Sequence, residues 1–202
     1  MELTDSNWYI ILKDILTFGV TVAGLIIAGM GLATWKKQIK GAKEFEVAYD
    51  LHYSILKLRN AIRHVRHPGI WPSESRKAIE YSKLKYPDKN LEEIEKNPHA
   101  YVYEMRWEKI TEADTEIESH LLAGEVLWGY DIKNQLKPLD TKVTELNIAL
   151  QQRFQPELRT KSHMEIHDIM YDQLNDSMND KFGREIDKII ESIATYLKQK
   201  IT

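Results

Sequence analysis

Hydrophobic and polar residues are distributed unevenly along the chain, beginning with an apolar run near its N-terminus. Residues 15–35 contain no Asp, Glu, Lys or Arg. As an α-helix this run would extend about 31 Å, close to the roughly 30 Å thickness of a bilayer's hydrocarbon core. Trp8 and Tyr9 precede the run and Trp35 ends it, as expected of aromatic residues at the two membrane interfaces. We therefore predict a transmembrane anchor within residues 1–40.

The charges on the two sides of this run differ in sign. Its N-terminal side carries Glu2, Asp5 and Asp14, with Lys13 as the one positive residue, and its C-terminal side is followed by four lysines: Lys36, Lys37, Lys40 and Lys43. The positive-inside rule then predicts a single pass through the inner (cell) membrane, with the N-terminus outside and the rest of the chain in the cytoplasm. A cleaved signal peptide is the competing interpretation. The run is long for a signal peptide, however, and lysines follow it instead of a small-residue cleavage site.

Small residues recur within the predicted anchor. Thr17, Thr21, Gly24, Ala28 and Gly31 follow one another at alternate spacings of four and three, which places them on one stripe of a helix. Small side chains allow a second transmembrane helix to approach closely. The stripe therefore predicts association of the anchor, including a homo-oligomer. The alternative is that glycine and alanine are simply frequent in membrane helices.

Beyond residue 41 the apolar positions recur at intervals of three and four residues, the period of an α-helix. Four long segments show this period: 51–65, 99–127, 132–154 and 182–197. No segment alternates as a strand would. We therefore predict an all-α fold, with an N-terminal transmembrane helix followed by an antiparallel bundle of about four long helices, each burying one face. This bundle would occupy residues 41–202.

Shorter helices are expected in the connections. Residues 67–98 form a proline-punctuated insert, with short helices near Ser75–Leu84 and Leu91–Lys96. Pro138 should kink the third long helix or reset its start. Residues 162–178 are also predicted to be helical. Their apolar stripe consists of five residues: Met164, His167, Tyr171, Leu174 and Met178.

A basic cluster lies at the end of the first long bundle helix. Arg59, Arg63 and Arg66 are spaced by four and three residues and so share one helix face. Their guanidinium groups could capture an anion, such as a phosphate, a nucleotide or an acidic segment of a partner. The alternative is ion pairing with the acidic second helix, through residues such as Glu104 or Glu116.

The same helix contains the sequence Arg59-Asn60, three residues, then His64. This spacing resembles the catalytic motif of HEPN-type ribonucleases, which are all-helical and act as dimers. The resemblance implies that Arg59 and His64 form the catalytic pair and that Asn60 supports them. An arginine would stabilise phosphate charge and a histidine would transfer a proton. The motif covers six residues and lies on an early helix, whereas the family carries it on a late one.

Two histidines are the candidate metal ligands. His163 and His167 are four residues apart, so their imidazoles could hold zinc from one helix face. No paired third ligand is identifiable. His167 also lies on the apolar stripe, where a core histidine with satisfied hydrogen bonds is the alternative interpretation.

Composition narrows the range of functions further. The chain has no cysteine, which excludes disulfides, thiolate metal sites and cysteine nucleophiles. Its 28 Lys and Arg residues nearly balance its 31 Asp and Glu residues, for a net charge of -3. That balance argues against extensive wrapping of nucleic acid. No phosphate-binding loop, nucleophile elbow or HExxH pattern occurs, so we predict no cofactor.

Three segments, LKLRNAIRHVRHP, RWEKITEAD and GEVLWGYDIKNQLKPL, follow the predicted anchor. Together they resemble a group of bacterial proteins with a single N-terminal anchor, a cytosolic helical domain and no established activity. The resemblance covers most of residues 10–155. It implies this architecture and a bacterial inner-membrane setting, and it implies no reaction.

These features favour a non-enzymatic role over catalysis. The first hypothesis is a membrane-anchored interaction or sensing module, which would recruit an unidentified cytosolic protein partner. The second is a membrane-perturbing effector of a toxin or phage-defence system, in which single spans would have to oligomerise to form a pore. The third is the HEPN-like ribonuclease.

Overall fold

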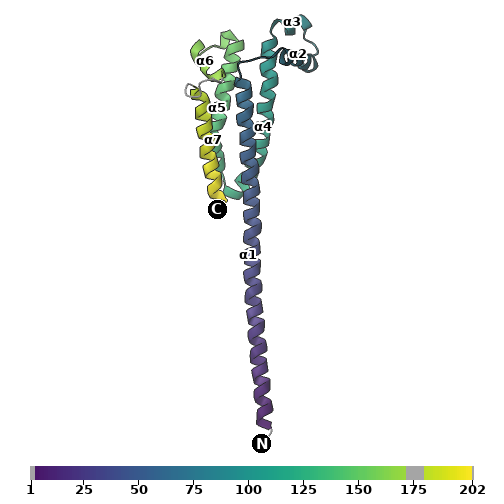
Figure 1. Cartoon of the computed structure of the whole chain (residues 1–202), viewed down its shortest axis with the longest axis vertical. Helices are drawn as coiled ribbons and strands as arrows, with labels where there is room; N and C mark the ends of the chain where they lie inside the picture. The colour runs from purple at the N-terminus through teal and green to yellow at the C-terminus, as the bar shows by residue number, and fades with distance from the viewer. Residues whose placement is uncertain (1–2, 172–179, 202) are drawn as a thin grey trace. The chain divides into compact units, whose positions relative to one another are not determined.

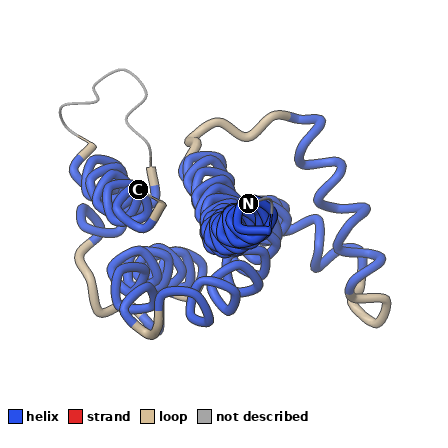
Figure 2. Tube along the Cα trace, turned by 90° about the horizontal axis from the view of Figure 1, so that it is seen from below, coloured by secondary structure: helices blue, strands red, loops and turns tan. Residues whose placement is uncertain are grey.

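The structure, a computed structural model, describes residues 3–171 and 180–201. Within them it contains helices and loops and no strand (Figure 2), which confirms the predicted all-α fold. The helices, in chain order, are α1 (Leu3–Arg66), α2 (Pro72–Lys85), α3 (Leu91–Lys96), α4 (Pro98–Trp128), α5 (Asp131–Phe154), α6 (His163–Met170) and α7 (Lys181–Lys200), with a 3-10 turn at Pro156–Leu158 between α5 and α6. The chain divides into two compact units, Met1–Phe45 and Glu46–Thr202.

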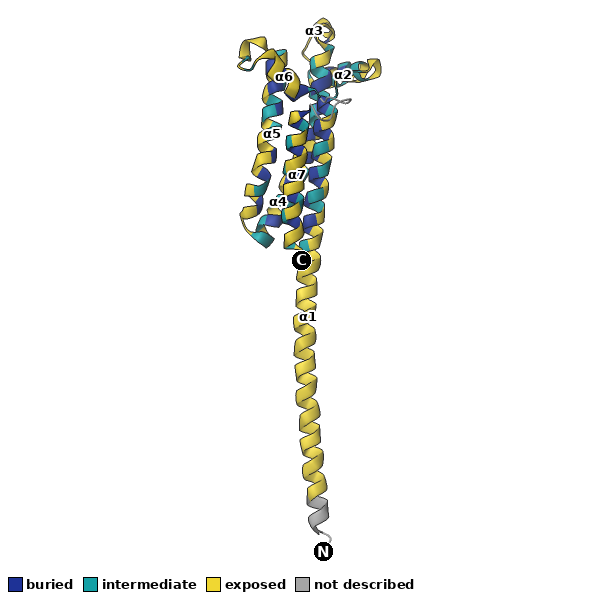
Figure 3. Ribbon diagram, turned by 60° about the vertical axis from the view of Figure 1, so that its left-hand side comes forward, coloured by how far each residue is buried: buried dark blue, intermediate teal, exposed yellow. Residues whose placement is uncertain are grey.

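The N-terminal unit, Met1–Phe45, is helical throughout its described part and contains the predicted anchor. Its apolar stretch is long and hydrophobic enough to cross a membrane, and none of that stretch is buried within the protein (Figure 3). Leu25 and Ile27 are each 69% exposed. The hydroxyls of Thr17 and Thr21 donate to the carbonyls one turn earlier, each at 2.8 Å. These bonds satisfy the polar side chains without water, as a span in lipid requires.

The C-terminal unit, Glu46–Thr202, is a helical bundle with its own hydrophobic core. Residues 46–66 of α1 lie beside α4, α5 and α7, and successive long helices run in opposite directions (Figure 1). Their inward faces are buried (Figure 3). Side chains from all four helices meet in one cluster that includes Leu51, Ile62, Ile110, Leu146 and Ile193. This confirms the predicted bundle of four long helices.

The connections also agree with the predicted insert. Helices α2 and α3 occupy the two segments expected between the prolines. Asn90 caps α3, because its side chain accepts a hydrogen bond from the backbone N–H of Glu92 at 3.3 Å. Gly129 ends α4 with a φ of 77°, a conformation that glycine adopts without the steric penalty of a side chain. Helix α5 continues through Pro138, so this proline does not reset the start of the helix.

Helix α6 differs from its prediction in both length and orientation. It ends at Met170, and its buried residues are Ile166, Ile169 and Met170. Met164 and His167, which the apolar stripe placed inward, are exposed, and Leu174 and Met178 lie outside the described residues. The interpretation of His167 as a core histidine is therefore wrong. A capping box between Ser162 and Glu165 begins α6 at His163. The face that carries the isoleucines is buried in place of the more polar stripe, because isoleucine is among the residues most often found in protein cores.

In helix α7 the apolar period predicts that Ile189 faces the core, and the structure differs there. Ile190 is buried between Ile186 and Ile193, whereas Ile189 is half-buried. Two consecutive isoleucines satisfy the helical period almost equally well, so the period cannot choose between them.

Candidate functional site

Two arginines are buried where α1 ends, although arginine is almost never fully buried unless it is paired. Arg66, in the last turn of α1, is 1% exposed, and Arg106, on α4, is 2% exposed. Each lies among apolar positions of its helix, next to Val65 in one case and one turn from Ile110 in the other. These two side chains organise the end of the bundle.

Arg66 joins α1 to α6 and α7. Its Nη2 lies 2.7 Å from Oδ1 of Asp180, and its Nη1 lies 2.9 Å from Oδ2 of the same carboxylate. Its Nε donates to the carbonyl of Ile169 at 2.7 Å, and Nη2 also reaches the carbonyls of Asp168 and Tyr171. The guanidinium is therefore paired and hydrogen-bonded on several sides, as a buried charge requires.

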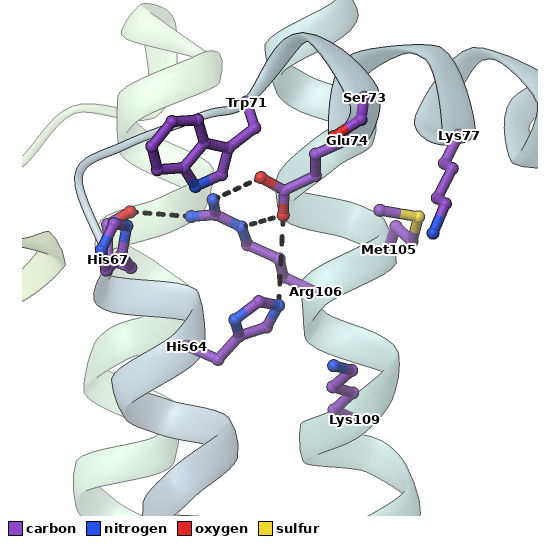
Figure 4. Close-up of a pocket in the computed structure, with 9 residues that line it drawn as sticks. All are labelled: His64, His67, Trp71, Ser73, Glu74, Lys77, Met105, Arg106 and Lys109. Atoms are coloured by element: carbon purple, nitrogen blue, oxygen red, sulfur yellow. Dashed lines mark hydrogen bonds and ion pairs between the residues drawn. The ribbon is translucent and has the colours of Figure 1, made fainter.

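Arg106 holds the chain segment that leaves α1. Its Nη1 donates to the carbonyl of His67 at 2.7 Å, and its Nη2 donates to the carbonyl of Gly69 at 2.6 Å. Its Nε and Nη2 lie 2.7 and 2.8 Å from the two carboxylate oxygens of Glu74, on α2 (Figure 4). The hydrogen bond from Arg106 holds the pKa of Glu74 below its usual value. One side chain thus fastens α4, α2 and the end of α1 together.

A cavity of about 420 Å³ opens beside Arg106 (Figure 4). We name it the α2–α4 pocket. Its walls come from the end of α1, the following loop, α2 and α4, and its lining residues are His64, His67, Trp71, Ser73, Glu74, Lys77, Met105, Arg106 and Lys109.

The α2–α4 pocket carries an excess of positive charge. Three of its lining residues are cationic, Lys77, Arg106 and Lys109, against the single carboxylate of Glu74. Glu74 is already engaged by Arg106. No ion pair joins Lys77 or Lys109 to an acidic residue in the part of the chain that the structure describes. The pocket is therefore suited to an anion.

His64 lies at the edge of this pocket. Its Nε2 is 4.0 Å from Oε1 of Glu74. Burial lowers the pKa of His64, and the positive charges of Lys109 and Arg106 lower it further, against the opposing effect of Glu74. The imidazole is therefore neutral at pH 7 and retains one N–H donor.

The three arginines predicted to bind an anion or a partner have different surroundings. Arg63 is exposed, and its Nη2 lies 3.0 Å from Oδ2 of Asp187 on α7. Arg59 is half-buried and close enough to His52 for its charge to lower the pKa of that histidine, and its Nε has no hydrogen-bond partner among the described residues. Arg66 is buried against Asp180. The charges of Arg63 and Arg66 are matched within the chain by α7 and the residue before it.

The acidic second helix, α4, pairs with a lysine of α1 instead. Lys57 Nζ lies 2.8 Å from Oε2 of Glu116. Glu104, also on α4, forms an ion pair with Lys85 of α2, in which Lys85 Nζ lies 3.1 Å from Oε1 of Glu104. The alternative interpretation of the arginine cluster predicted ion pairs with glutamates of α4. In the structure, Arg63 and Arg66 pair instead with two aspartates, Asp187 and Asp180.

The residues that resemble a ribonuclease motif do not all line the α2–α4 pocket. His64 lines the α2–α4 pocket, which does not include Arg59 or Asn60. The positive charges of Arg59 and of Lys198 on α7 lower the pKa of His52, whereas the charge of Lys109 on α4 lowers the pKa of His64. Residues five apart on a helix differ by about 140° in direction, which accounts for this separation. The catalytic pairing of Arg59 and His64 stays a prediction.

The two candidate metal ligands lie near two arginines, and His167 Nδ1 also lies 3.8 Å from Oδ1 of Asp168. His163 Nε2 is 2.5 Å from Nη1 of Arg159. His163 and His167 also line a small cavity that includes Arg153 and Arg159. Among the described residues, no three His, Asp or Glu side chains are placed to hold a metal ion.

Several residues of the α2–α4 pocket were not singled out from the sequence. The sequence did contain one sign of them: Arg106 lies one turn from both Val102 and Ile110, so a cation interrupts an apolar helix face. An arginine at such a position needs a buried partner. Nothing in the local pattern, however, identified Glu74 as that partner or brought Lys77 near Lys109.

Comparisons with known proteins add neither a family nor a function to what the structure shows. No family model matches the chain, and neither the curated proteins nor the solved structures give a match. The resemblance to bacterial single-span proteins therefore stays a prediction, and the candidate site is defined by its geometry alone.

Proposed function

We propose that this protein is a single-span membrane protein whose C-terminal unit is a cytoplasmic interaction and sensing module. The observation that carries the proposal is the contrast between the two units. The N-terminal unit presents a long apolar helix with no buried residue in its most hydrophobic stretch, while the C-terminal unit encloses a complete core of its own. An exposed apolar surface of this length needs a bilayer to cover it.

The orientation follows from the flanking charges. Lysines follow the apolar stretch, and the positive-inside rule places the C-terminal unit on the cytoplasmic side. The bundle offers both a polar surface for protein partners and a basic pocket for a small ligand. These features fit a sensing module that binds a small ligand and acts on a cytosolic protein partner.

Membrane fractionation of cells that express the full chain tests the location. We expect the protein to stay with the membrane after alkaline carbonate extraction. A C-terminal tag should be protected from external protease in intact spheroplasts and cleaved after permeabilisation. Extraction by carbonate would refute the anchor, and cleavage in intact spheroplasts would refute the orientation.

Crosslinking in native membranes, followed by purification of the full chain, tests the interaction role. We expect a reproducible crosslinked partner that is absent when the N-terminal unit alone is expressed. If the full chain yields only its own monomer, the interaction role is refuted.

A membrane-perturbing effector is the second candidate, and the open glycine positions favour it. A Cβ added at Gly24 or Gly31 would meet no atom within 4 Å, so this helix face can accept a neighbouring helix at close range. The test is overexpression with a membrane-potential dye. A loss of polarisation that depends on the small-residue stripe would support this role, and unchanged polarisation at high expression would remove it.

A further inference from the structure

The two lysines of the α2–α4 pocket differ from other lysines of the bundle in their ion pairing among the described residues. Lys57, Lys85 and Lys142 each pair with a glutamate of another helix. Lys77 of α2 and Lys109 of α4, in contrast, have no such partner among the described residues and line the same cavity. Two like charges on one cavity repel each other, and an anion between them would offset this repulsion.

The frame around these lysines is fixed. Arg106 and Glu74 connect α4 to α2 through two hydrogen bonds of 2.7 and 2.8 Å, and the guanidinium of Arg106 is buried. The same guanidinium holds the carbonyls of His67 and Gly69. The pocket is therefore formed before a ligand arrives, which reduces the ordering that binding requires.

An aromatic side chain stands beside the charges. Trp71 lines the pocket and is 67% exposed, and Met105 adds an apolar surface. An exposed tryptophan offers a flat surface on which a planar ring can stack. The cavity of about 420 Å³ falls in the usual range of roughly 300–1,000 Å³ for small-molecule sites.

We propose that the α2–α4 pocket binds a nucleotide, with its phosphate between Lys77, Lys109 and His64 and its base against Trp71. A phosphate dianion matches the excess of two positive charges, and lysine ammonium groups are common phosphate ligands. An isolated carboxylate would match only one of those charges and would leave Trp71 unused. The proposal involves binding alone and no reaction of the nucleotide.

His64 gives the proposal an independent readout. The groups that face it are Lys109 and Arg106 of α4, Glu74 of α2 and His67 of the loop that follows α1. Burial and the neighbouring cations keep its pKa below the usual value. A bound phosphate would offset those cations and favour the protonated imidazole. Protonation of His64 should therefore favour nucleotide binding as the pH falls below about 7.5, until the phosphate itself takes up a proton near about pH 6 and loses one of its two charges.

The proposal deepens the sensing role proposed above, but its test does not depend on the membrane location. Isothermal titration calorimetry of the purified full chain in detergent would use AMP, adenosine and inorganic phosphate as separate probes. We expect AMP to bind more tightly than either fragment. If AMP does not bind at millimolar concentration, or binds no better than inorganic phosphate, the nucleotide site is refuted even if the protein proves to be membrane-anchored.

Variants of the pocket sharpen the test. K77A and K109A should each weaken AMP binding by about tenfold, the loss expected for one charge-assisted hydrogen bond. K83A is the matched control, because Lys83 is also on α2 and exposed but does not line the pocket. W71A should weaken binding of AMP but not of inorganic phosphate. Equal effects of K77A and K83A would overturn the proposal, as would an unchanged AMP affinity in W71A.

Discussion

Arg66 Nη2 lies 2.7 Å from Oδ1 of Asp180, and the two side chains are only 1% and 10% exposed. The pair links the last turn of α1 to the residue that caps α7, whose carboxylate also accepts the backbone N–H of Gly183 at 2.9 Å. An arginine that the sequence grouped with two others as an anion site is thus neutralised inside the bundle. Arg66 is buried, whereas Arg63, one turn away in the same helix, is exposed.

The first prediction concerns this difference in burial. R66A should lower the free energy of unfolding by about 3–5 kcal/mol, because it leaves the carboxylate of Asp180 buried without its partner. R63A, which breaks the exposed pair with Asp187, should cost only about 0–1 kcal/mol. Urea unfolding followed by the fluorescence of Trp107 and Trp128 measures both. Equal losses in the two variants would contradict the assignment of Arg66 as the structural member of the cluster.

The second prediction concerns Gly183. A Cβ at this position would lie 2.1 Å from Oδ2 of Asp180 and 3.1 Å from Nη1 of Arg66. G183A must therefore displace the carboxylate from its place between the helix cap and the guanidinium, which should cost about 2 kcal/mol.

The control for Gly183 is a helical glycine with open space around it. A Cβ at Gly41 would meet no atom within 4 Å, so G41A should leave the unfolding of the C-terminal unit unchanged. The same urea titration compares the two variants. A G183A protein as stable as the original would show that Asp180 can move without loss.

The third prediction concerns pH. Burial, followed by neighbouring cations, lowers the folded-state pKa of both His52 and His64 from 6.5. Below pH 6.5 the unfolded chain binds protons that these folded histidines do not. Their contribution to stability is therefore present above about pH 6.5 and is lost as the pH falls through their folded-state pKa values.

Unfolding in urea at a series of pH values checks this effect. The free energy of unfolding should fall between about pH 7 and pH 5, and the fall should be shallower in the double variant H52Q/H64Q. H167Q, which replaces a histidine whose side chain is 62% exposed, is the matched control. A slope that is the same in all three proteins would refute the linkage.

The fourth prediction concerns the small-residue stripe of the N-terminal unit. Because the chain has no cysteine, a single T21C substitution reports the approach of two copies through an oxidative crosslink in the membrane. G24L/G31L should reduce the crosslinked dimer severalfold, since leucine side chains would keep the helices apart.

The matched variant for the stripe is G19L/G29L. These two glycines are also exposed and open, but at about 100° per residue they fall off the stripe. This variant should retain the crosslink. If both double variants lose the dimer to the same extent, a specific seam along Thr17, Thr21, Gly24, Ala28 and Gly31 is refuted.

The order and approximate bounds of the helices could be predicted because they depend on local pattern. The short helix α3 was located between two prolines, and α4 and α5 meet at Gly129, whose backbone favours a helix end. The pattern failed where two faces of a helix were almost equally apolar, as in α6 and at Ile189 and Ile190 of α7. There the choice depends on which side the rest of the bundle covers.

The sequence by itself determined an apolar helix long enough to span a membrane and a helical bundle after it, because hydrophobic length and period are properties of neighbouring residues. Only the tertiary structure decided the roles of the charged residues. Arg66 and Asp180 are 114 positions apart, and Arg106 and Glu74 are 32 apart. Burial and pairing across such separations depend on how the helices pack. For that reason only the tertiary structure shows that His64 of α1 and Lys109 of α4 line one basic pocket.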